Sequence, residues 1–489
     1  MRKIEIVLLG FLAASCSVGP DYRRPALYKD TAIQESLGLK EISGRLVTKD
    51  WYKDFNDPVL NRLVADALKN SPNVKIAVQK LREARSTLKI NAVNNFPMFN
   101  ADGSYHYNKP SKSIGYTIDT DYYQLGLDAS WELDIWGGGR RQTESSMALF
   151  EAAAASLDNV YLTMTAEVAA DYIGLRTAQE QIRIAEQNLK LQEDIYDVIA
   201  AKNKYGLADN VALNQAKYTV ETTRSTIPDL KKQEEAYKNA LAILVGKLPG
   251  TLDVLLSESK RNLIRRRFGY DLSRLYELPV ATVRNRPDVR IAERQLHAQN
   301  ALGGKAIADL YPNVSFSGFL GWQSLEVSGL IDKKSYMYNY SPSVTLPILH
   351  WGQLQNQVEL QKETTLEYFY QYQNSVLNAV SEIKNSMTAL NEEYRKNTSS
   401  YQAAKAQKSA AALTLDKYNR GLVEFSDVMT AQQNLLASQN QLVVSNGQIY
   451  LDVIAFYKAS GGGYQPQTFE QAYMSPLLKG LPCKARCGL

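Results

Sequence analysis

Two kinds of hydrophobic periodicity follow one another along the chain. Residues 99–107 and 123–135 alternate apolar and polar side chains, and this period of two predicts strands with one apolar face. From about Thr143 to Lys204 apolar residues recur in steps of three and four without a proline, which predicts one helix on the order of 90 Å long. After Gly206 a second helical pattern continues to Gly246. The pattern therefore predicts two strands followed by a long helical hairpin.

The same succession of elements recurs after a constant offset of 215 residues. Strand patterns return at 314–322 and 338–348, and the hairpin returns from about Gln353 to Gly461. In each copy a helix precedes the strands, with a proline in its first turn and another proline after its end. This spacing indicates a tandem duplication of one unit. Matched positions include Pro72 and Pro287, Pro97 and Pro312, Trp136 and Trp351, Gly137 and Gly352, Gly206 and Gly421, and Gly246 and Gly461.

The first sixteen residues have the pattern of a lipoprotein signal. Arg2 and Lys3 precede an apolar run from Ile6 to Ala14, and small residues then lead to Cys16. The run is too short to span a bilayer, and a cysteine at its end suits cleavage after the thiol has received a diacylglycerol. We expect Cys16 to begin the mature chain and to carry a covalent lipid, with no other cofactor. The alternative is a plain secretory signal followed by a fortuitous cysteine.

These patterns divide the chain into segments. The tail contains Cys483 and Cys487 without a nearby histidine, which favours a disulfide or two free thiols over a metal site. The predicted segments are a signal peptide (1–15), an N-terminal lipidated segment (16–70), a first repeat (71–246), an inter-repeat equatorial linker (247–285), a second repeat (286–461) and a C-terminal tail (462–489).

Charge and motif content argue against several classes of function. The 56 basic and 51 acidic residues are interspersed and give a net charge of +5, so no nucleic-acid partner is expected. His106, His297 and His350 are scattered, and the chain has no metal-ligand or phosphate-loop motif, so neither a metal site nor an enzyme is expected. The mature sequence has no run of 18 apolar residues, so any membrane crossing must be made by strands.

The predicted strands and hairpins require more than one chain. A soluble sandwich would also alternate with period two, but the long helices favour strands of a membrane barrel. Four strands cannot close a barrel, and open edges are excluded in lipid because every backbone polar group there needs a partner. Two chains would supply eight strands and leave little lumen, whereas three would supply twelve and leave a channel. Three chains would also place six helical hairpins side by side as a tube.

Three local sequences carry a resemblance to a known family. They are the Cys-Ser-Val-Gly-Pro-Asp-Tyr-Arg-Arg-Pro start at Cys16, the Trp-Gly pair after each second strand, and the Tyr-x-x-Gly-Leu turn at Tyr418. Together with the duplication, their order and spacing resemble the TolC-type outer-membrane factors, the outer membrane efflux protein family, in its NodT/OprM-like lipoprotein branch. The resemblance covers the mature chain to about Gly461.

The resemblance implies a fold, a location and partners. The fold class is mixed α/β and mainly α, in which the duplicated unit forms a trimeric 12-stranded outer-membrane β-barrel continued by a 12-helix periplasmic α-barrel. The homotrimer would lie in the Gram-negative outer membrane, lipid-anchored and extending into the periplasm. It would be the exit duct of a tripartite efflux pump for drugs or other small molecules, with a periplasmic adaptor and an RND-type inner-membrane transporter. The alternatives are a type I protein-secretion channel and a non-conducting coiled-coil envelope lipoprotein, and the period-two strands argue against the latter.

In the family the tips of the helical hairpins meet the adaptor, and the matching residues here are Gly206, Leu207, Gly421 and Leu422. Each glycine permits a tight reversal between helices, and each leucine is expected at an exposed tip. The alternative interpretation is that both pairs only shape the turns.

The resemblance also places a periplasmic gate at Tyr418 and Asp427. Asp427 matches a lumen-facing carboxylate near the sealed tip, and Tyr418 matches a tyrosine that ties neighbouring helices closed. Val423 stands where some members have a gating arginine, which departs from the family pattern. The alternative for Asp427 is a solvated carboxylate in the first turn of a helix, where the macrodipole favours negative charge. Only the second hairpin carries the pair, because the counterparts in the first are Asn203 and Ala212.

Overall fold

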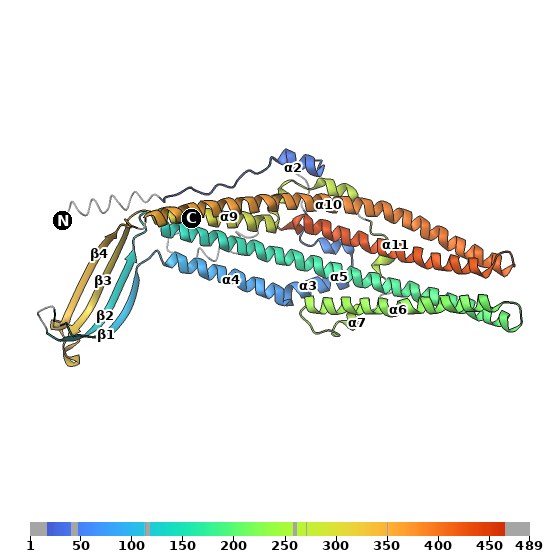
Figure 1. The fold of residues 1–489 in the computed structure, drawn as a ribbon, viewed down its shortest axis with the longest axis horizontal. Coiled ribbons are helices and arrows are strands. Elements are labelled where there is room, and N and C mark those ends of the chain that lie inside the picture. Colours follow the sequence, from blue (N-terminus) through green and yellow to red (C-terminus); the bar gives the residue numbers. More distant parts are fainter. Residues whose placement is uncertain are drawn as a thin grey trace. The chain divides into compact units, whose positions relative to one another are not determined.

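The four predicted strands form one antiparallel sheet in a computed structural model that describes residues 17–40, 47–111, 113, 118–257, 262–269, 271–349 and 351–464. They are β1 (Met98–Asn108), β2 (Thr120–Glu132), β3 (Asn313–Ser324) and β4 (Tyr336–Thr345), and they pair in chain order (Figure 1). Strand β2 of the first repeat pairs with β3 of the second, so the two repeats share one sheet. Among the described residues, the outer edges of β1 and β4 have no partner strand.

The sheet has one apolar face, which confirms the predicted period of two. Leu127, Leu320 and Tyr338 lie opposite one another on β2, β3 and β4, and they are 50%, 48% and 67% exposed. The adjacent set of paired residues lies on the other face of the sheet and includes Asp128 on β2 and Asn339 on β4. Large apolar side chains are therefore exposed on one face and polar side chains line most of the other.

Strand β2 ends three residues before its sequence pattern, which continued to Ile135. The Asp134 carboxylate accepts hydrogen bonds from the backbone N–H groups of Gly139 at 3.0 Å and Arg140 at 2.9 Å. These donors lie in the first turn of the following helix, where backbone N–H groups have no partner within the helix. Asp134 thus caps that helix, and the chain leaves the sheet after Glu132.

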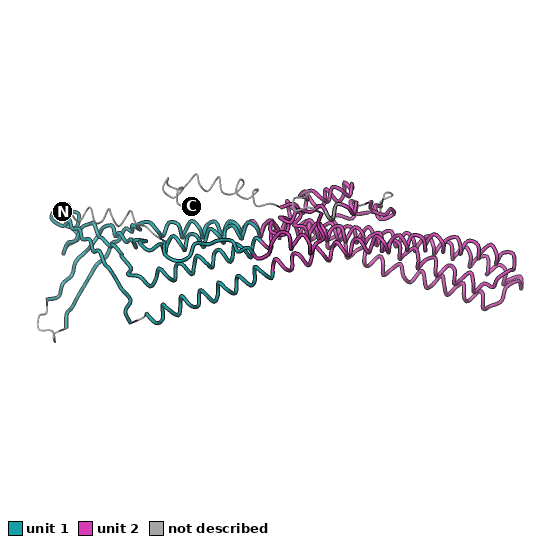
Figure 2. Tube along the Cα trace, turned by 90° about the horizontal axis from the view of Figure 1, so that it is seen from above, with its two compact units in different colours: residues 1–26, 79–155, 290–374 teal, residues 27–78, 156–289, 375–489 magenta. Residues whose placement is uncertain are grey.

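The described chain divides into two compact units (Figure 2). Unit 1 contains the sheet and comprises residues 17–26, 79–155 and 290–374, and unit 2 comprises the remaining described residues. Each unit therefore contains parts of both repeats. The predicted repeats, 71–246 and 286–461, describe the order of elements along the chain. The compact units instead group the segments that pack together in space.

In unit 1, the helix that precedes the strands of the second repeat packs against both long helices. Arg294 donates to Glu151 of the first long helix at 2.7 Å, and Gln299 donates to Gln361 of the second at 2.5 Å. The first repeat's contact to the second is therefore made by helices as well as by strands. The helices are α4 (Pro72–Val93), α5 (Gly138–Lys204), α9 (Pro287–Ala308) and α10 (Trp351–Asn419).

Unit 2 contains most of each predicted helical hairpin, whereas the first part of each long helix lies in unit 1. Helix α5 is followed by α6 (Asn210–Leu244), and α10 is followed by α11 (Phe425–Ala459). Both hairpins were predicted from the helical spacing of apolar residues. The return helices α6 and α11 lie in contact with each other. No helix among the described residues is long and apolar enough to cross a membrane.

Unit 2 also contains short helices for which the sequence pattern had no expectation. The segment before the first repeat forms three of them, and its Trp51, which is 1% exposed, stacks on Tyr457 of α11 at 5.0 Å. Aromatic packing of this kind attaches the N-terminal segment to the helical core. The short helices of this unit are α2 (Asp30–Leu37), η1 (Trp51–Phe55), α3 (Pro58–Asn70), α7 (Asp253–Leu256), η3 (Leu263–Arg265), η4 (Leu272–Glu277), α8 (Ala281–Asn285) and η7 (Gly461–Gly463); η5 (Val327–Gly329) and η6 (Lys333–Ser335) lie between β3 and β4.

Candidate functional site

The first hairpin reverses direction at a glycine in the left-handed backbone conformation. Gly206 has a φ of +73°, which side chains with a Cβ rarely adopt. The N–H of Gly206 donates to the carbonyl of Asn203 at 2.9 Å, and that of Leu207 donates to Lys202 at 2.8 Å. These two bonds satisfy carbonyls at the end of α5 that would otherwise lack a partner. The sequence therefore needs glycine here for its backbone.

The second hairpin repeats this turn at an offset of 215 residues. Gly421 also has a φ of +73°, and its N–H donates to the carbonyl of Tyr418 at 2.9 Å. The N–H of Leu422 donates to Lys417 at the same distance. A Cβ on either glycine would have nothing within 4 Å, so the backbone conformation alone selects glycine.

Both predicted tip leucines are exposed. Leu207 is 77% exposed and Leu422 is 68% exposed, and Tyr205, beside the first glycine, is 76% exposed. Exposed apolar side chains at the end of a hairpin are suited to contact with another protein. The glycine and leucine of each pair thus have the positions expected of them, and their contact with an adaptor stays a prediction.

Tyr418 packs into a small core just behind the turns. Its ring meets that of Phe425 edge-on with 5.4 Å between centroids, and the ammonium of Lys202 lies 4.9 Å from its centroid. Burial, with a smaller contribution from the Asp209 carboxylate, raises the pKa of the Tyr418 phenol. One side chain of α10 therefore contacts both α11 and the end of α5. The buried residues of this core are Ile199, Ala216, Phe425 and Val428.

Asp427 lies in the first turn of α11 and is exposed. Its backbone N–H donates to the carbonyl of Glu424 at 3.2 Å. Among the described residues, no hydrogen bond or ion pair involves its carboxylate. Tyr418 and Asp427 are therefore placed near the same tip but in different environments, since Tyr418 is packed against other side chains and Asp427 faces outward from its helix.

Sequence reasoning identified Tyr418 but missed its partners, Lys202 and Phe425. The sequence did contain a signal for Phe425, because the matching position of the first repeat is Asn210 and only the second repeat has an aromatic residue there. The two repeats thus differ at Tyr418, Phe425 and Asp427 together, which marks the second tip as the specialised one. Lys202 gave no such signal, because its counterpart Lys417 is also a lysine.

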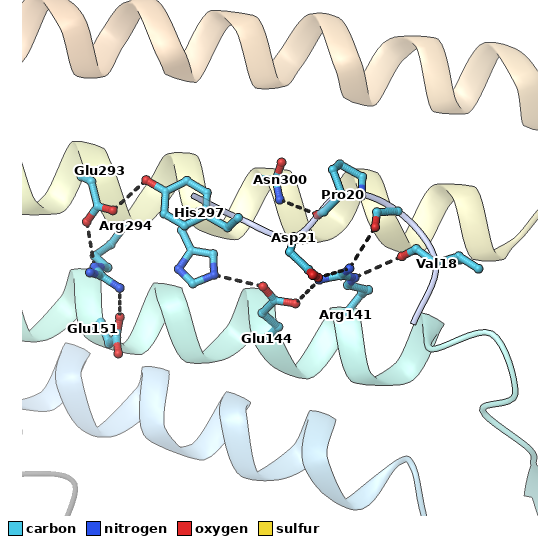
Figure 3. A network of polar contacts seen from close by, with 12 residues as sticks. Val18, Pro20, Asp21, Arg141, Glu144, Glu151, Glu293, Arg294, His297 and Asn300 are labelled. Atoms are coloured by element: carbon cyan, nitrogen blue, oxygen red, sulfur yellow. Dashed lines mark hydrogen bonds and ion pairs between the residues drawn. The ribbon is translucent and has the colours of Figure 1, made fainter. Parts of the chain in front are cut away.

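Cys16 lies outside the described residues, but the segment that follows it is well anchored within unit 1 (Figure 3). The N–H of Val18 donates to the carbonyl of Trp136 at 3.0 Å. Arg141, whose side chain is 4% exposed, donates to the carbonyls of Val18 and Gly19 and forms an ion pair with Asp21 at 2.8 Å. Residues 18–21, which follow Cys16 in the sequence, are therefore bound beside the junction of β2 and α5.

The chain is duplicated and combines a β-sheet that has one exposed apolar face with two long helical hairpins. This combination defines a class of envelope-spanning channel subunit. The family model described as outer membrane efflux protein matches residues 63–247 and 278–462, two segments whose starts are again 215 residues apart. The chain belongs to this family. It is an outer-membrane protein with the mainly helical fold and small sheet of the efflux channels.

Full-length relatives agree with this assignment. The "Cation efflux system protein CusC" of Escherichia coli O6:H1 is 27% identical over 458 residues, which is 92% of this chain and 96% of the relative. The "Nodulation protein T" of Rhizobium leguminosarum bv. viciae is 28% identical over 464 residues, 94% of each chain. The solved outer-membrane channel OprN has a TM-score of 0.85 at 29% identity and covers 92% of this chain and 100% of its own.

Proposed function

We propose that this protein is the outer-membrane exit duct of a tripartite efflux pump and exports drugs or other small molecules. The observation that carries the proposal is the pairing, in one duplicated chain, of a sheet with an exposed apolar face and two hairpins with exposed apolar tips. The sheet suits lipid on one face and water on the other. The tips suit an adaptor, which would connect the duct to an RND-type inner-membrane transporter.

We propose a homotrimer as the functional form. The sheet has four strands and unpartnered outer edges among the described residues, and such edges need partners in lipid. Three copies supply twelve strands, enough for a barrel with a lumen, and six hairpins for a periplasmic tube. Covalent lipid on Cys16 would add an anchor in the outer membrane.

The proposed gate lies at the hairpin tips. Three copies would bring three Asp427 carboxylates together, and rings of carboxylates favour cations in channels. Tyr418, packed against Phe425 and Lys202, would hold the second hairpin against the first within each chain. Opening would then require the second hairpin to move relative to its neighbours.

Single-channel recording of the purified protein in planar lipid bilayers tests the duct. We expect discrete conductance steps, small in the closed form and larger when the tip contacts are broken by Tyr418→Ala with Phe425→Ala. A trimer that inserts but never conducts would support the non-conducting coiled-coil envelope lipoprotein instead.

Affinity purification from cross-linked cells tests the pump assignment. We expect a periplasmic adaptor and an RND-type transporter to co-purify with the protein. Recovery of an ABC transporter with a secreted protein substrate would replace efflux by type I protein secretion.

A further inference from the structure

A small cavity lies inside unit 2, where residues of α5, α6 and α11 meet. Its walls include two buried carboxamides, those of Gln192 on α5 and Gln432 on α11, which are 4% and 3% exposed. About 10 Å³ of the cavity is available to the centre of a water molecule, which is the space that one ordered water needs. The other lining residues are Ile195, Ala216, Thr219, Val428 and Met429.

Both carboxamides need hydrogen bonds that the described residues do not supply. The Nε2 and Oε1 atoms of Gln192 are buried without a partner there, and so is the Oε1 atom of Gln432. The third polar group at the cavity, the Thr219 hydroxyl, already donates to the carbonyl of Gln215 at 3.2 Å. A buried amide without partners is destabilising, because it has lost its bonds to solvent and gained none in return. The cavity therefore presents both a free donor and free acceptors.

On one side of the cavity, α5 and α11 are joined directly. One helical turn before Gln192, the Asn188 amide donates to the Oε1 atom of Gln439 on α11 at 2.9 Å. Farther from the hairpin tips, Gly447 of α11 lies so close to α5 that a Cβ would overlap the Thr177 side chain. The two helices are therefore held in a fixed position along this part of their interface.

On its other side, the cavity borders the small core behind the hairpin turns. Ala216 and Val428 line the cavity and also belong to that core. The same core contains Phe425, against which Tyr418 packs. The cavity thus separates the contacts of the proposed gate from the directly joined part of the interface between α5 and α11.

We propose that one ordered water molecule binds in this cavity, accepting a hydrogen bond from Gln192 and donating one to Gln432, and that this hydrated layer lets α11 shift against α5 when the gate opens. A bound water can exchange its hydrogen bonds as the helices move, so the layer can re-form in more than one arrangement. Interlocked apolar side chains have one best fit and resist such a shift. The role in opening rests on the proposed function, whereas the water site does not.

The duplicated positions do not repeat this pair of amides. The counterpart of Gln432 is Lys217, which is exposed. The counterpart of Gln192 is Gln407, whose amide donates to the carbonyl of Ala431 at 3.2 Å. The water site is therefore a feature of one place in the chain, and Gln407 provides a matched glutamine that already has a partner.

A crystal structure of the wild-type protein, at a resolution that shows ordered solvent, tests the water site directly. We expect a solvent peak within about 3.2 Å of the carboxamides of both Gln192 and Gln432. Two carboxamides bonded directly to each other, or no solvent peak between them, would overturn the site.

Replacing both amides by methionine tests the site through stability. Gln192→Met with Gln432→Met keeps unbranched side chains of similar size, removes the groups that need hydrogen bonds, and displaces the water. We expect the Tm to rise by about 2 °C or more. Gln407→Met is the matched control and should not raise the Tm, because it removes an amide that already has a partner. A Tm of the double variant at or below the wild-type value would contradict the proposal.

Recording in planar bilayers tests the role in opening. Adding the two methionines to the Tyr418→Ala, Phe425→Ala variant should reduce its gain in conductance several-fold, whereas adding Gln407→Met should leave that gain unchanged. An undiminished gain with the two methionines would show that the hydrated layer is not where α11 shifts. A wild-type protein that never conducts would instead refute the proposed duct, and the solvent peak and the Tm would still decide the water site.

Discussion

At the scale of the residue, the exposed side chains of Leu207 and Leu422 are predicted to contact the adaptor. Replacing both by aspartate should abolish cross-linking to the adaptor, because a charged group would have to be buried at the contact. The turns should persist, since their hydrogen bonds use only backbone atoms. Cross-linking in cells, together with native gels that still show trimers, measures the effect.

Val254→Asp is the matched control for these leucine substitutions, because Val254 is 92% exposed and lies in α7, outside the hairpin turns. It should leave adaptor cross-linking intact. If the double leucine variant cross-links as well as the wild type does, the leucine side chains do not contact the adaptor.

Asp427 is predicted to set the ion preference of the closed pore. Asp427→Asn should reduce cation selectivity and block by divalent cations in the reconstituted protein, because it would remove the three charges of the proposed carboxylate ring. Asp427→Glu keeps the charge and should retain both properties. Unchanged selectivity in the asparagine variant would place the carboxylate away from the constriction and favour a role in the first turn of the helix.

Glu144 forms an ion pair with Arg141, which binds the N-terminal segment, and a hydrogen bond with His297 of α9, and the stability that it contributes depends on pH. The hydrogen bond with His297, assisted by Arg141, holds the pKa of Glu144 below its ordinary value of 4.5, against the opposing effect of burial. A lowered carboxylate pKa stabilises the fold above that ordinary value, and the stabilisation is lost as the pH falls through the lowered pKa. Below about pH 4.5 the wild-type Tm should therefore fall more steeply than that of Glu144→Gln.

Glu363→Gln is the control for this titration, because Glu363 is exposed on α10 and lies away from His297 in the sequence. Its Tm should follow the wild-type curve over the same pH range. Parallel curves for Glu144→Gln and the wild type would show that this carboxylate does not contribute to the acid sensitivity.

At the scale of the element, the two hairpin turns depend on backbone conformation. Gly206→Ala with Gly421→Ala should destabilise each turn by about 1 kcal/mol, because a Cβ is strained at positive φ. Asparagine tolerates this conformation better, so the corresponding asparagine pair should lose less. Denaturant unfolding followed by helical circular dichroism measures the difference, and identical losses for alanine and asparagine would show that the left-handed backbone conformation does not set the stability of the turns.

At the scale of the whole molecule, the anchor and the barrel are expected to act at different stages. Cys16→Ala should reduce delivery to the outer membrane more than it reduces the stability of trimers that do arrive, because a barrel embedded in lipid is held independently of acyl chains. Membrane fractionation measures delivery, and heating in detergent measures stability. Mass spectrometry should find acyl chains on Cys16; a mature N-terminus elsewhere would remove the anchor.

Much of the element order follows from local patterns. Helix and strand periods are properties of neighbouring residues, so α5, α6, α10 and α11 could be predicted to within a few residues at most of their ends. The turns at Gly206 and Gly421 were equally readable, because left-handed glycines are a local requirement. The end of β2 was not, because Asp134 stops the strand by capping the next helix.

The sequence by itself determined the duplication, the elements and the residues at each turn, since all of these depend on short stretches of chain and on their repetition. Only the tertiary structure decided that Tyr418 packs on Lys202, that the N-terminal segment is bound by Arg141, and that the compact units combine parts of both repeats. These contacts join residues more than a hundred positions apart, and their partners are selected by the packing of whole helices.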